Sequence, residues 1–178
     1  MKKFLEAIAS TDRARLIGEH CPKPLTKLPM LLALYGIIVH CGPPSINPEH
    51  GIMHIPVWAG VWTPKTLSLA IVQFAHFRLH RSLLLRGTKL RFPHFHQAFV
   101  YASAFALPRQ QVLSHPMVVG RAVRDVTVSR LAIDFCCTPE LVDERLTALA
   151  LNSDGPATPP PVSLKKDCTT VPRLAVCP

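Results

Sequence analysis

The sequence predicts an α+β fold in which a small sheet packs against several helices, with a C-terminal helix pair and a disordered tail. Apolar residues at helical spacing alternate with short β-branched runs along most of the chain. Apolar residues make up 48% of the 178 residues, which is enough for one sizeable core. From residue 152 onward the chain has no periodicity and four prolines between residues 156 and 161, so no folded structure is expected there.

The N-terminal third is expected to hold two helices and two strands. Residues 3–18 and 28–35 have the apolar spacing of helices, and Gly36 suits the end of the second one. The β-branched run at 37–39 predicts a buried strand, the proline-containing stretch 42–49 a loop, and residues 51–58 a second strand. We divide the chain into an N-terminal helix at 1–24, a main domain at 25–151 and a tail at 152–178.

The clearest predicted helix covers residues 65–85. Thr63 is a candidate N-cap, and Pro64 occupies the first helical position, where its missing N–H costs nothing. The following residues are apolar on most sides of the helix, which places this helix in the core. Gly87 is expected to end it.

The remaining elements are expected to be an aromatic loop and three helices. Residues 92–96 predict the loop, 97–106 a helix rich in small residues, 109–123 a less regular stretch, and 127–135 and 140–151 the last two helices. This final pair has the outline of a helix-turn-helix. Because its second helix carries Glu140, Asp143 and Glu144, which would repel phosphate, we favour a packing role over DNA reading.

The net charge of +9 is concentrated in the middle of the chain. No Asp or Glu lies between Glu49 and Asp125, whereas nine Lys and Arg residues do, and these account for the whole excess. Such a block suits a nucleic acid, an acidic protein or a membrane surface, and the alternative is a solvated face with no fixed partner. The candidate partner-binding residues are Arg78, Arg81, Arg86, Lys89 and Arg91.

The six cysteines include no C-x-x-C pair, and the first residues lack the pattern of a cleavable signal peptide. Reduced thiols in the cytoplasm are therefore expected. The apolar runs are too short or too interrupted to span a bilayer, so no membrane partner is expected.

His76 and His80 are four residues apart on the predicted long helix. This spacing places two imidazoles on one face, one turn apart, as needed to bind one metal ion. Metallopeptidases use H-E-x-x-H, in which the Glu takes a proton from metal-bound water. Here the second position is Phe77, which cannot accept a proton. By spacing alone, the pair also fits two ordinary histidines on a buried helix.

Three blocks of sequence, the first of which contains this pair, resemble the pattern of a known family. Residues 55–84, IPVWAGVWTPKTLSLAIVQFAHFRLHRSLL, resemble the strand, turn and A-H-E-L-G-H helix of the ImmA/IrrE family of zinc-peptidase-like proteins. Residues 97–108 resemble its E-A-N-x-F-A-A-x-L-L-M-P segment, and residues 129–146 its closing helix pair. The blocks occur in the same order, and the resemblance covers roughly residues 25–151. It implies a zincin-like fold and a bacterial or mobile-element protein.

The resemblance also implies a ligand set for zinc, with departures. His76 and His80 match the two ligand histidines, and Gln97 stands where the family has its third ligand, a Glu. A neutral amide binds zinc less well than a carboxylate, so we also consider His94 and His96, above all His96, as replacements. The proton acceptor is replaced by Phe77, and the catalytic residues are unknown.

Family members cut or bind repressors. The resemblance therefore implies a regulatory protein, impaired in catalysis, that binds a repressor or another regulatory protein. Two alternatives stay open: an active zinc peptidase with atypical ligands, and a nucleic-acid-binding module that uses the basic block.

Overall fold

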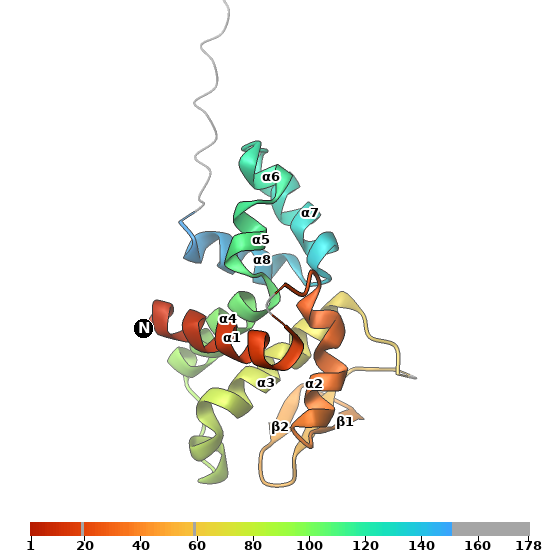
Figure 1. Cartoon of the computed structure of the whole chain (residues 1–178). Helices are drawn as coiled ribbons and strands as arrows, with labels where there is room; N and C mark the ends of the chain where they lie inside the picture. The colour runs from red at the N-terminus through yellow and green to blue at the C-terminus, as the bar shows by residue number, and fades with distance from the viewer. Residues whose placement is uncertain (19, 59, 151–178) are drawn as a thin grey trace, which may run out of the picture.

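The fold is mixed α+β, as predicted. The computed structural model describes residues 1–18, 20–58 and 60–150. In these residues a three-stranded sheet lies at one end of the molecule, beside α2 (Leu28–Leu34), and α5 to α8 form the other end (Figure 1). The 3₁₀-helix η1 (Pro24–Lys27) leads into α2. The predicted tail at 152–178 lies outside the described residues.

The sheet has the order β1-β3-β2. Strands β1 (Ile38–Cys41) and β3 (Ile52–Ile55) correspond to the two predicted strands and pair in parallel. The prediction that the first of them is buried was wrong, because β1 lies at the edge of the sheet and Ile38 is 60% exposed. Strand β2 (Ser45–Asn47) pairs antiparallel with β3 inside the stretch that we predicted as a loop, so that prediction was wrong. Prolines on both sides of these three residues hid the strand, but an edge strand needs only one ladder of hydrogen bonds. Met53 and Ile55 of β3 are fully buried, and β3 packs on α3.

Helix α3 (Pro64–Leu85) runs through the centre and begins as predicted. The Thr63 hydroxyl accepts the N–H of Thr66 at 3.2 Å, and the Thr66 hydroxyl accepts the N–H of Thr63 at 2.8 Å. This reciprocal pair satisfies two N–H groups that a helix start otherwise leaves unpaired. Gly87, with φ +66°, follows the last turn, also as predicted. The sequence did not indicate that the helix departs from helical geometry at His80, where φ is −125° and ψ is 16°.

Helix α4 (Phe92–Ala106) packs against α1 (Lys2–Ile17), α3 and α8 (Figure 1). It includes residues 92–96, so the predicted aromatic loop was wrong. Pro93 misled that prediction, although proline is well tolerated in the first turn of a helix. Ala98, Ala102 and Ala106 are fully buried along α4. Their small side chains allow the neighbouring helices to approach closely.

The C-terminal part closes the core from the other end. The stretch that looked irregular forms two short helices, α5 (Arg109–Leu113) and α6 (Pro116–Val119). The predicted pair is present as α7 (Arg124–Phe135) and α8 (Pro139–Ala148). Leu131, Leu141 and Leu146 of this pair are buried, and α8 packs on α4. The N–H of Thr138, between the two helices, donates to the Ser68 hydroxyl of α3 at 2.9 Å.

Candidate functional site

His76 and His80 lie together on α3, as their spacing predicted. Their ring centroids are 5.6 Å apart, and the two residues are only 2% and 4% exposed. Both therefore belong to the interior of the protein. Burial on this scale disfavours the charged form of an imidazole.

A third imidazole comes from the first turn of α4. The ring of His94 lies 5.0 Å from that of His80, and the His94 carbonyl accepts a hydrogen bond from His80 Nε2 at 3.1 Å. His94 Nδ1 accepts the backbone N–H of Arg91 at 3.0 Å. Helix α4 begins at Phe92, so His94 belongs to its first turn. Helix α4 packs against α3, and His94 in this turn therefore lies beside His80. The three rings form what we call the imidazole cluster: His76, His80 and His94.

His76 is the unusual member of the imidazole cluster. Neither Nδ1 nor Nε2 has a hydrogen-bond partner among the described residues, although both atoms are buried. The ring of Phe95 packs edge-on against it at 5.1 Å. Burial, with smaller contributions from the neighbouring His80 and His94, lowers the pKa of His76 to about 4. The ring is therefore neutral at pH 7, which is the form that coordinates metals, and a buried polar group without a partner requires an explanation.

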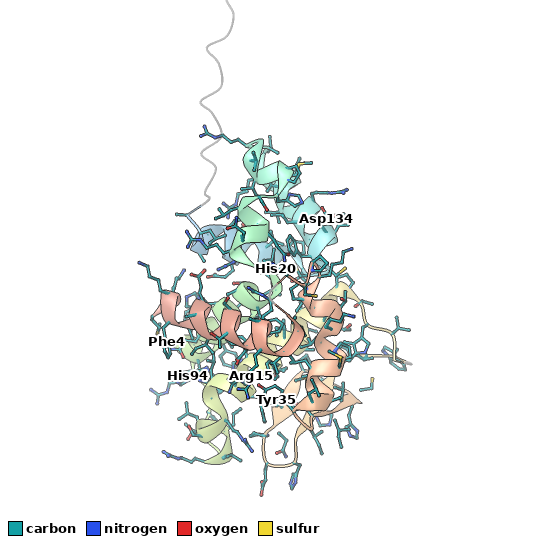
Figure 2. All side chains as sticks on the ribbon, in the orientation of Figure 1. Phe4, Arg15, His20, Tyr35, His94 and Asp134 are labelled. Carbon is teal, nitrogen blue, oxygen red and sulfur yellow. The ribbon has the colours of Figure 1, made fainter. Side chains whose placement is uncertain are left out.

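The other predicted ligands lie elsewhere. Gln97 Nε2 donates to the sulfur of Met1 at 3.3 Å, and His96 stacks against Phe92 with a centroid distance of 6.4 Å. Figure 2 shows Phe4 and His94 on the side of the molecule where α1 begins. Neither Gln97 nor His96 hydrogen-bonds to His76 or His80 in the described part of the chain.

The predicted ligand side chains do not form a complete zinc site. Zinc needs three or four converging ligands, and the residues that the structure describes hold no group of three His, Cys, Asp or Glu side chains arranged for a metal ion. His80 Nε2 is occupied by the His94 carbonyl. The neutral, partnerless His76 is the one feature that suits a ligand, so zinc stays a prediction.

Phe77 lies in the core at the position where the resembling peptidases have their proton acceptor. It is 7% exposed, and its ring contacts those of Tyr35 and Phe74 at centroid distances of 6.3 and 6.4 Å. The guanidinium of Arg81 lies over its ring at 5.1 Å. An apolar side chain in this position cannot accept a proton from water.

Sequence reasoning missed a carboxylate that reaches α3 from α1. Asp12 accepts two hydrogen bonds from Arg78, at 2.9 and 3.0 Å, and one from the Tyr101 hydroxyl at 2.8 Å. The hydrogen bond that Arg78 donates to Asp12 raises the pKa of Arg78. A signal was available, because Asp12 lies at helical spacing from Leu5 and Ala9, on the buried face of α1. Its oxygens are held by Arg78 and Tyr101, so Asp12 does not supply the missing base to the imidazole cluster.

The five predicted partner-binding residues fall into two groups. Arg78 and Arg81 are engaged, by Asp12 and by the Phe77 ring. Arg86, Lys89 and Arg91 are exposed, and none of the ion pairs of the described residues includes them. Phe92 and Phe95, which follow directly, are 82% and 52% exposed. We call Arg86, Lys89, Arg91, Phe92 and Phe95 the 86–95 surface.

Comparisons of the chain with models of known protein families, with curated proteins and with solved structures find no match. The resemblance to the ImmA/IrrE family therefore rests on the sequence motifs alone. Among the described residues, none of the helices has both the length and the apolar character needed to cross a membrane.

Proposed function

We propose that the chain is a regulatory protein of the ImmA/IrrE type that has lost efficient peptidase activity and acts by binding a partner protein. A repressor or another regulator with an acidic surface is the partner that this proposal implies. The observation that carries it is Phe77, buried in the core where a peptidase needs its proton acceptor.

The loss of a proton acceptor has a large kinetic effect. A positioned general base contributes about 10²–10⁴-fold to the rate, or roughly 3–5 kcal/mol of activation free energy. His76 is a poor substitute, because a base with a pKa of about 4 has little affinity for a proton at pH 7. Asp134 of α7 accepts hydrogen bonds from His115 and Arg130, which hold this carboxylate away from the role of base.

The 86–95 surface supports binding as the remaining activity. Its three cations, Arg86, Lys89 and Arg91, attract an acidic partner. Phe92 and Phe95 offer apolar area, and aromatic residues of this kind dominate the binding energy of many interfaces. This combination suits an amphipathic protein segment with acidic residues beside apolar ones.

A nucleic acid is the second candidate partner. Aromatic side chains among cations also suit single strands, whose bases stack on aromatic rings while the cations contact phosphates. The two candidates differ in what they need from the aromatic pair. A duplex, with its bases stacked inside, would depend on the three cations alone.

The test compares three probes against the same surface. The probes are a fluorescent amphipathic peptide with Glu and Leu at helical spacing, a single-stranded oligonucleotide and a random duplex, each titrated over a salt series. The variant is Arg86→Gln/Lys89→Gln/Arg91→Gln. The control is Arg15→Gln/Lys23→Gln/Lys27→Gln, which removes the same charge from exposed positions elsewhere.

We expect the peptide to bind, with affinity reduced about tenfold or more in the surface variant and unchanged in the control. Tighter binding of either nucleic acid, with a steep fall in affinity as salt rises, would favour the second candidate. Equal peptide affinity in the variant and the control would refute a binding role for this surface.

A further inference from the structure

A cleft on another part of the molecule is strongly basic. It lies between α1, α5 and the C-terminal end of α4, and its volume is about 470 Å³. Figure 1 shows α1 running below α5 and α8 in the view, and His20, labelled in Figure 2, also lines the cleft. The cleft shares no residue with the imidazole cluster or with the 86–95 surface.

The charge of this cleft is unbalanced. Its described lining includes four cationic side chains, from Lys3, Arg13, Arg109 and Arg145, but only one carboxylate, from Glu6. Glu6 forms an ion pair with Arg145. Among the lining residues that the structure describes, positive charges thus exceed negative ones by three, and low-dielectric walls strengthen their combined field.

Two of the four cations are held rigidly. Arg13 is 5% exposed and donates to the carbonyl of Ala104 at 2.9 Å. Arg145 is 3% exposed and donates through Nε to the carbonyl of Leu107 at 2.9 Å. These bonds satisfy carbonyls at the end of α4, and they fix both guanidinium groups before any ligand arrives. Preorganised donors lose less entropy on binding.

The other two cations of the cleft, Lys3 and Arg109, do not share the structural role of Arg13 and Arg145. Lys3 and Arg109 are exposed at the cleft and take part in none of the ion pairs of the described residues. Burial lowers the pKa of Arg145, partly offset by Glu6, and the charge of Arg109 lowers it further. The charge of Arg109 thus disfavours the charged form of Arg145, and an anion in the cleft would relieve that repulsion.

We propose that this cleft binds a phosphate monoester. Arginine presents planar donors that match phosphate oxygens, and lysine adds a compact charge, so this lining suits a doubly charged phosphate group. The volume exceeds what a bare phosphate fills and falls in the range of small-molecule sites. Ser10 and Gln110, also in the lining, offer neutral hydrogen bonds for the group that carries the phosphate.

The experiment uses the full chain and calorimetric titration with inorganic phosphate, adenosine monophosphate and a phosphoserine peptide, at matched ionic strength. The variant is Lys3→Gln/Arg109→Gln, chosen because both side chains are exposed and their loss leaves the core unchanged. The control is Lys23→Gln/Lys27→Gln, which removes the same charge elsewhere.

We expect saturable binding of at least one phosphate probe at one site, weakened about tenfold in the variant and unchanged in the control. Whichever of adenosine monophosphate and the phosphoserine peptide binds with higher affinity identifies the class of molecule that carries the phosphate group. Binding that is equal in the variant and the control, or no saturable binding of any probe, would overturn the proposal.

Discussion

The Asp12–Arg78 ion pair is the interaction whose removal should be most informative about stability. We expect Arg78→Met to lower the free energy of unfolding by about 2–3 kcal/mol at pH 7. Breaking a fully buried pair costs about 3–5 kcal/mol, whereas a surface pair contributes about 0–1 kcal/mol. The pair lies between these limits, because the Asp12 side chain is 8% exposed and that of Arg78 is 34% exposed.

The physical reason is the carboxylate that the substitution leaves behind. Without Arg78, the buried carboxylate of Asp12 keeps only the hydrogen bond from Tyr101. The double variant Asp12→Asn/Arg78→Met removes that charge as well. It should therefore be less destabilised than the sum of the two single variants, with a coupling energy of about 1–2 kcal/mol.

Urea unfolding followed by far-ultraviolet circular dichroism measures all these variants. Arg86→Met is the matched control, since Arg86 is exposed just after the same helix and should shift the free energy by no more than about 0.5 kcal/mol. A loss below about 0.5 kcal/mol for Arg78→Met, together with additive single variants, would show that the pair is solvated and that the reasoning is wrong.

Three further predictions concern the imidazoles and the thiols. In metal-free protein, His76 has a lower pKa in the folded state than in the unfolded state, so the unfolded state binds the proton first as the pH is lowered. The free energy of unfolding should therefore decrease by about 3 kcal/mol as the pH falls from 6.5 to about 4. His76→Leu should flatten that pH profile, and an unchanged slope would contradict the burial argument. With zinc added, the wild-type chain should cleave casein no faster than His76→Ala/His80→Ala, and faster wild-type cleavage would restore the active-peptidase alternative. Burial raises the pKa of Cys137 to about 12, whereas Cys41 is exposed. In an assay with a disulfide reagent at pH 8, Cys41→Ser should therefore remove one rapidly reacting thiol, and Cys137→Ser should remove no rapidly reacting thiol.

Local signals in the sequence predicted the elements whose ends are set by neighbouring residues. Thr63, Pro64 and Gly87 define both ends of α3, and each acts within a few positions of itself. The start of α4 and strand β2 were missed for one shared reason. Proline there looked like a break, yet the first turn of a helix and the flanks of an edge strand both accept it.

The candidate site was only half predictable, because its key contacts join distant parts of the chain. The pairing of His76 with His80 follows from one helix turn. The approach of His94 depends on where α4 begins, and Asp12 meets its partner across 66 positions of sequence. No periodicity reports such a contact, although a charged residue on the apolar face of a helix indicates that some partner exists.

The alanines of α4 determine how this protein tolerates mutation. Ala98, Ala102 and Ala106 have no exposed surface, so a longer side chain at any of them must shift neighbouring side chains or backbone. Each such enlargement costs about 1–3 kcal/mol, a large share of the stability of a typical small domain. Substitutions in this chain are therefore tolerated least where the side chains are smallest. A library that randomises these three positions and is selected for folded protein should yield mainly alanine, glycine and serine.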